Sequence, residues 1–141
     1  MRKFKFKLEK LLDIRKFREE ECLLALGQAI SVLNKIENDI KETAVKKHNA
    51  ALRRFEDTDE ITAWENYIER LDMETVYLTE QAANAEIIVE QKRALYLEAQ
   101  RKLEAMVSLK KTEQKEYRKE VMDYQMSEVD DITSARWGLD I

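Results

Sequence analysis

The sequence predicts an all-α protein, a long two-helix antiparallel coiled coil (αα-hairpin). Its 141 residues include no proline and two glycines, and 38% of them are charged, a composition typical of long helices. Apolar residues recur every 3.5 residues on average along two long stretches, which is the spacing of a left-handed coiled coil. Such a long, narrow apolar seam must be covered by another long helix, so we expect no enclosed pocket and no enzyme.

The first helix is predicted over residues 5–55. Its seam advances in steps of four and three through Leu8, Leu12, Arg15, Glu19, Cys22, Leu26, Ala29, Leu33, Ile36 and Ile40. Arg15 and Glu19 interrupt the apolar series, either as an ion pair that fixes register or as a solvated pair at a frayed end. Cys22 is predicted to be a buried structural thiol. Residues 4–8 alternate apolar and basic side chains, which also fits an extended segment.

The turn is predicted at residues 56–60, where the apolar seam is broken. Asp57 and Glu60 have the spacing of a capping box, in which side-chain oxygens accept hydrogen bonds from the free amides of a new helix. A connection this short makes the two helices antiparallel. The numbers of facing residues should then sum to roughly 116.

The second helix is predicted over residues 61–126. Its seam passes through Trp64, Ile68, Leu71, Thr75, Leu78, Ala82, Ala85, Val89, Lys92, Tyr96, Ala99, Leu103 and Met106. Trp64 lies near the turn and is expected to pack under it. Residues 127–141 are predicted to form a flexible acidic tail. We expect the whole chain, residues 1–141, to be a single coiled-coil domain.

Charge is distributed unevenly along an acidic chain of net charge −4. Antiparallel pairing brings residues 1–20 beside residues 100–119, and these two segments hold 15 basic and 7 acidic residues, a net charge of +8. Such a basic tip favours an acidic partner, a phosphate backbone or an anionic membrane. The plain alternative is that its lysines only keep a helix end soluble.

Residues with catalytic or metal-binding potential are sparse. His48 is the only histidine, and we expect it on the surface rather than in a site. No glycine-rich phosphate loop is present, and no stretch approaches the roughly 20 apolar residues of a membrane span. We therefore expect no catalytic residue, no metal and no cofactor. Tyr67 and Tyr77 lie off the seam, either as anchors for a protein partner or as residues that widen the seam.

Both ends of the chain resemble one protein family. Residues 4–15, FKFKLEKLLDIR, with the charged run at residues 18–21, resemble the start of flagellar export proteins of the FliJ family. Residues 128–137, EVDDITSARW, are similar to the acidic C-terminal segment of that family. The chain length and the expected hairpin agree with this resemblance.

The resemblance implies a non-enzymatic, cytoplasmic component of the flagellar type III export apparatus, peripherally associated with the inner membrane. It implies a coiled coil similar to the central stalk of rotary ATPases. The implied partners are the hexameric export ATPase FliI, the export-gate protein FlhA and export chaperones, with no nucleic acid and no small-molecule substrate. The residues expected to face the ATPase are Arg15, Arg18, Lys110, Lys111 and Lys115. Tyr67 and Tyr77 are expected to meet the gate.

Two other functions fit the same residues. A generic structural coiled-coil adaptor, such as a homodimer, has the same apolar pattern. A nucleic-acid-binding coil would use the basic tip for phosphates, but stacking aromatics among the basic residues and an overall basic charge are absent from the sequence.

Overall fold

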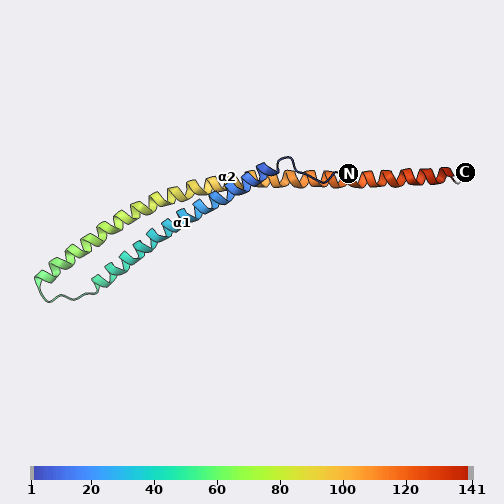
Figure 1. The fold of residues 1–141 in the computed structure, drawn as a ribbon. Coiled ribbons are helices and arrows are strands. Elements are labelled where there is room, and N and C mark those ends of the chain that lie inside the picture. The colour runs from blue at the N-terminus through green and yellow to red at the C-terminus, as the bar shows by residue number, and fades with distance from the viewer. Residues whose placement is uncertain (1, 140–141) are drawn as a thin grey trace. The chain divides into compact units, whose positions relative to one another are not determined.

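The computed structural model describes residues 2–139 and consists of two long helices (Figure 1). Helix α1 spans Glu9–Ala51, 43 residues, and helix α2 spans Thr58–Leu139, 82 residues. No strand occurs in residues 2–139. The predicted fold class, an all-α helical hairpin, is confirmed.

The chain divides into two compact units, each of which is considered by itself. The terminal unit comprises Met1–Glu19 and Ala99–Ile141, and the loop unit comprises Glu20–Glu98. In the terminal unit Glu9 of α1 forms an ion pair with Lys110 of α2, and in the loop unit Lys47 pairs with Asp72. The two helices therefore run antiparallel in each unit. That the whole chain is one domain stays a prediction.

The predicted apolar seam is the buried face of both helices. Every predicted seam position of α2, from Trp64 to Met106, is buried or half-buried, and so is every position of α1 from Leu12 to Ile40. Cys22 is buried, as predicted. Leu8, which precedes α1, is the exception and is exposed. Periodicity alone therefore identified which face of each helix meets the other.

On the seam Thr43 is buried and Thr75 is half-buried, and the hydroxyl of each is hydrogen-bonded. The Thr43 hydroxyl donates to the Asp39 carbonyl at 2.9 Å, and the Thr75 hydroxyl donates to the Leu71 carbonyl at 2.8 Å. A buried polar group is costly mainly when it lacks a hydrogen bond, so these local bonds let threonine replace an apolar residue at the seam.

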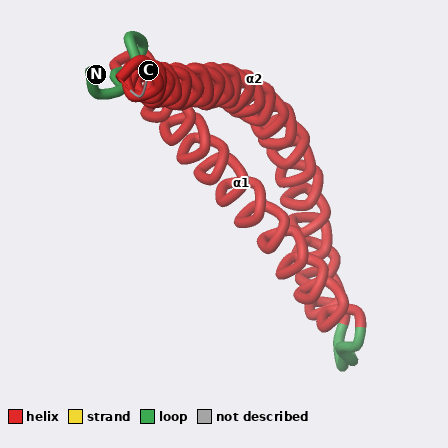
Figure 2. The backbone as a smooth tube through the Cα atoms, turned by 90° about the vertical axis from the view of Figure 1, so that its right-hand side faces the viewer, coloured by secondary structure: helices red, strands yellow, loops and turns green. Residues whose placement is uncertain are grey.

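Residues 52–57, drawn as a green loop in Figure 2, connect the two helices. The Asp57 carboxylate accepts a hydrogen bond from the Glu60 amide at 2.8 Å, and the Glu60 carboxylate accepts one from the Glu56 amide at 3.1 Å. The predicted capping spacing is thus used, with Asp57 as the cap. Helix α2 begins directly after it at Thr58, so the turn lies earlier than the predicted 56–60, and α1 ends at Ala51 rather than at 55.

Trp64 closes the loop end of the hairpin, as expected. Its indole N–H donates to the Ala50 carbonyl at 2.7 Å, and its ring meets the Phe55 ring edge-on with centroids 5.4 Å apart. Ala50 lies in the last turn of α1, where carbonyls receive no amide from within the helix, and its carbonyl also accepts a hydrogen bond from the Arg53 amide at 3.2 Å. Trp64 therefore ties the end of one helix to the start of the other.

The register differs from the expected one by three residues. In three contacts between the N-terminal and C-terminal halves of the chain, the two residue numbers add up to 119. These contacts are Glu9 with Lys110, Lys47 with Asp72, and Arg2 with Tyr117. Residues 53–55 of the loop have no helical turn. An extended residue advances the chain by about 3.3 Å and a helical one by 1.5 Å, so the loop carries the start of α2 beyond the end of α1.

The outer bounds of both helices also need correction. Helix α1 begins at Glu9 rather than at 5, because residues 2–6 are not helical. Helix α2 continues to Leu139 rather than ending near 126. The predicted flexible tail is therefore wrong for residues 127–139, and residues 140 and 141 lie outside the described chain. No proline occurs in this stretch, and its one glycine is Gly138, so no helix breaker interrupts the acidic sequence.

We predict that Trp64→Phe lowers the free energy of unfolding by about 1 kcal/mol, because the hydrogen bond to Ala50 is lost while the ring is kept. Urea unfolding followed by circular dichroism measures this. Trp137→Phe is the matched control, because Trp137 is 71% exposed and its replacement should change stability by less than about 0.5 kcal/mol. Equal losses in both variants would contradict the proposed closure.

Candidate partner-binding surfaces

Residues 2–6 form an extended N-terminal arm that lies along α2 in the terminal unit (Figure 1). Phe6 is buried in an apolar cluster with Leu12 of α1 and Met106 of α2. The Phe4 ring stacks at 5.6 Å against the ring of Tyr117, whose hydroxyl donates a hydrogen bond to the Arg2 carbonyl. The arm is therefore held against α2 at Phe6, at Phe4 and at the Arg2 carbonyl, and its basic side chains lie beside α2.

The five predicted basic site residues all belong to the terminal unit but differ in what they can contact. The Lys110 ammonium lies 2.9 Å from the Glu9 carboxylate, and its side chain is 29% exposed. Arg15 is half-buried on the seam. Arg18, Lys111 and Lys115 are exposed. Lys110 thus serves the pairing of the helices, while Arg18, Lys111 and Lys115 lie on the exposed surface.

Carboxylates beside the arm were missed by the sequence prediction. The arm and the first residues after it line a surface groove together with Tyr117 and three glutamates of α2. The groove residues that carry charge are Arg2, Lys3, Lys5, Lys7, Glu113, Glu116 and Glu120. Part of the arm's positive charge is therefore offset locally. The alternation of aromatic and basic residues at 4–8 was the available signal for a docked extended segment.

Tyr67 and Tyr77 both lie on α2 in the loop unit, but they do not share one site. Tyr67 is half-buried in a hollow beside Trp64, and the Arg70 guanidinium lies 5.8 Å from its ring centre, within the range of a cation–π contact. Tyr77 is 60% exposed. Their separation along the helix is about 15 Å at 1.5 Å per residue.

Tyr77 lies within an exposed apolar patch that sequence reasoning missed. Met73 and Val76 are 67% and 59% exposed. Met73 stands four residues before Tyr77 and three before Val76, so the three side chains share one side of the helix. This patch, Met73, Val76 and Tyr77, shares its side of the helix with Glu69 and Glu80, which are also exposed. The sequence could have indicated this patch, because it groups large apolar residues at positions outside the predicted seam.

One titratable group in the terminal unit has a shifted pKa. The pKa of Tyr124 lies above its ordinary value, because its hydroxyl donates a hydrogen bond to the Glu128 carboxylate and because that negative charge disfavours the phenolate. The four-residue spacing of Tyr124 and Glu128 links two successive turns of α2.

Neither helix contains, within residues 2–139, a segment that is long and apolar enough to cross a membrane. In the same part of the chain, no group of three or more histidine, cysteine or carboxylate residues is placed to hold a metal ion. His48 is exposed in the last turn of α1, as predicted.

The fold and these surfaces define a helical-hairpin coiled coil whose candidate sites are exposed charged and aromatic side chains. Comparison with models of known families matches residues 4–139 to the family described as flagellar FliJ protein. The chain belongs to this family, which makes it a component of the flagellar protein export apparatus. The comparisons with curated proteins and with solved structures found no match. The resemblance seen at both ends of the sequence is confirmed.

We predict that Tyr117→Ala releases the N-terminal arm, because it removes the stacked ring and the hydrogen bond, together worth about 2 kcal/mol. Limited trypsin digestion at Lys3, Lys5 and Lys7 should become faster by about tenfold. Tyr124→Ala is the matched control, since Tyr124 is exposed and makes no ring contact with the arm. Unchanged digestion of Tyr117→Ala would show that the arm is held by Phe6 alone.

Proposed function

We propose that this protein is a stalk-like regulator of the hexameric export ATPase FliI, and that it links the ATPase to the export-gate protein FlhA and to export chaperones. The match of residues 4–139 to the flagellar FliJ family is the single observation that carries the proposal. We also propose that the protein lies in the cytoplasm, peripherally associated with the inner-membrane export apparatus.

The exposed basic residues of the terminal unit are the proposed ATPase contact. Arg18, Lys111 and Lys115 are exposed, so their charged groups can approach an acidic surface. Surface charge of this kind guides association and orientation more than it adds affinity. Arg15 and Lys110 support the contact from the seam, where the Lys110–Glu9 ion pair holds α1 against α2 and so keeps the exposed basic residues in place.

A coiled coil without reactive groups can regulate an ATPase only by binding some of its conformations more tightly than others. The seam favours this role, because the buried side of each helix holds the hairpin together while Lys111 and Lys115 remain on the exposed surface. Stimulation of ATP hydrolysis then depends on charge contacts made in one state of the ATPase and lost in another.

The patch of Met73, Val76 and Tyr77 is the proposed gate contact. Exposed aromatic and methionine side chains are common anchors at protein interfaces, because they supply large contact areas. Tyr67 contributes less directly, since it is half-buried beside the loop. The gate contact and the ATPase contact then use different units of the chain.

We predict that Lys111→Glu with Lys115→Glu abolishes stimulation of the ATPase, because two attractive contacts become repulsive. The steady-state rate of phosphate release by the purified ATPase measures this at low and physiological salt. Adding Arg15→Glu, Arg18→Glu and Lys110→Glu should not restore stimulation. Lys35→Glu with Lys41→Glu is the matched control, because both residues are exposed on α1 in the loop unit and the change in net charge is the same.

Circular dichroism should give the same helix content and the same unfolding midpoint for the Lys111, Lys115 variant and its control. Wild-type stimulation by the Lys111, Lys115 variant would refute the ATPase assignment. Equal loss in the control would show that net charge, rather than this surface, matters.

We predict that Tyr77→Ala weakens binding to FlhA by about tenfold, because an exposed aromatic anchor is truncated. Tyr67→Ala should have a smaller effect, and the double variant should resemble Tyr77→Ala. Surface plasmon resonance with the immobilised gate protein compares the three variants. A larger loss for Tyr67→Ala than for Tyr77→Ala would place the contact at the loop instead.

A further inference from the structure

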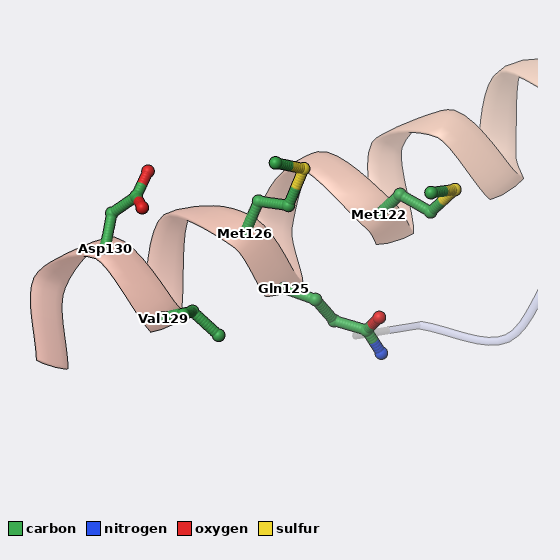
Figure 3. Close-up of a pocket in the computed structure, with 5 residues that line it drawn as sticks. All are labelled: Met122, Gln125, Met126, Val129 and Asp130. Carbon is green, nitrogen blue, oxygen red and sulfur yellow. The ribbon is translucent and has the colours of Figure 1, made fainter. Parts of the chain in front are cut away.

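An apolar face without a cover lies on α2 after the region that the N-terminal arm contacts. Met122, Met126 and Val129 are 61%, 62% and 59% exposed. Together with Gln125 and Asp130 they line a shallow hollow formed by α2 alone (Figure 3). In residues 2–139, no other segment buries these three side chains.

The spacing of this face is that of a coiled-coil seam. Met122, Met126 and Val129 follow one another by four and three residues, which places them on one side of the helix. A seam of this spacing is completed by a second helix whose side chains pack between its own. Methionine is unbranched and adaptable, so it can accommodate the side chains of such a helix without a preformed pocket.

Charge around the apolar face selects the partner. Residues 120–138 carry five acidic side chains, Glu120, Asp123, Glu128, Asp130 and Asp131, against one basic side chain, Arg136. A second copy of this face would bring one net charge of −4 against another, which disfavours self-pairing. A helix with basic residues beside its apolar seam would instead meet Asp123 and Asp130, which lie along one side of this face at 3.6 residues per turn.

We propose that this face binds a basic amphipathic helix of a partner protein. Apolar residues of that helix pack on Met122, Met126 and Val129, and its lysines or arginines pair with the surrounding carboxylates. The charge required of this partner is opposite to that of the acidic surface proposed for Lys111 and Lys115. The inference therefore concerns a separate contact and does not depend on the proposed regulation of the ATPase.

The probe for this proposal is a pair of synthetic peptides, each about three heptads long with leucine at the seam positions. One peptide carries lysine beside the seam and the other carries glutamate. Fluorescence anisotropy of each labelled peptide is measured against the full-length protein at two salt concentrations. We expect the lysine peptide to bind, with weaker binding at high salt, and the glutamate peptide not to bind.

Substitution then locates the contact. Met122→Gln with Met126→Gln and Val129→Gln should weaken binding of the lysine peptide by about tenfold or more. Leu23→Gln with Leu24→Gln is the matched control, because both leucines are exposed on α1, and it should bind as the wild type does. Glutamine preserves helix propensity, and circular dichroism checks that helix content is unchanged.

A second variant tests the charge and leaves the apolar side chains intact. Asp123→Asn with Asp130→Asn should weaken binding and flatten its salt dependence. The proposal is overturned if neither peptide binds, if both bind equally, or if the triple glutamine variant binds as the wild type does. It is also overturned if sedimentation velocity shows a dimer that the triple variant abolishes, because a second copy would then occupy the face.

Discussion

The apolar seam shared by α1 and α2 is the interaction on which the whole structure depends. Helices of this length cannot bury their apolar residues within themselves, and each is stabilised by the other along a narrow line of contact. Three of the buried seam residues of α2, Ala82, Ala85 and Ala99, are small, which lets the two helices approach closely. The seam uses one side of each helix, and the exposed candidate binding residues Arg18, Lys111, Lys115 and Tyr77 lie on the other sides.

A seam of this kind pairs the two helices but does not hold the ends of the paired segments. In each unit an aromatic side chain of α2 holds such an end by donating a hydrogen bond to a backbone carbonyl. In the loop unit the Trp64 indole donates to the Ala50 carbonyl, and in the terminal unit the Tyr117 hydroxyl donates to the Arg2 carbonyl. The ring of each of these aromatic residues of α2 also contacts the ring of a phenylalanine, Phe55 edge-on for Trp64 and Phe4 at a tilt for Tyr117. An aromatic ring with a polar tip suits a half-buried end, since the ring covers apolar surface while the tip satisfies a backbone group.

Sequence periodicity and capping chemistry predicted the fold, because both are local signals. The seam positions, the buried thiol of Cys22 and the Asp57–Glu60 cap follow from spacing alone. The register did not, because it depends on how far the extended residues 53–55 advance the chain. The acidic end of α2 suggested a flexible tail from composition, although nothing in residues 127–137 breaks a helix.

Site residues were less predictable, because their roles depend on contacts between segments distant in sequence. Lys110 forms an ion pair with Glu9, and Tyr67 is half-buried beside the loop. Neither residue is therefore the exposed binding residue that the sequence predicted. Within α2, positive charge at Lys111 and Lys115 gives way to carboxylates after residue 119. An acidic partner at those lysines would be repelled by the carboxylates if it approached in the reverse orientation. For the proposed ATPase contact, the change of sign along one helix would therefore favour one direction of binding over the other.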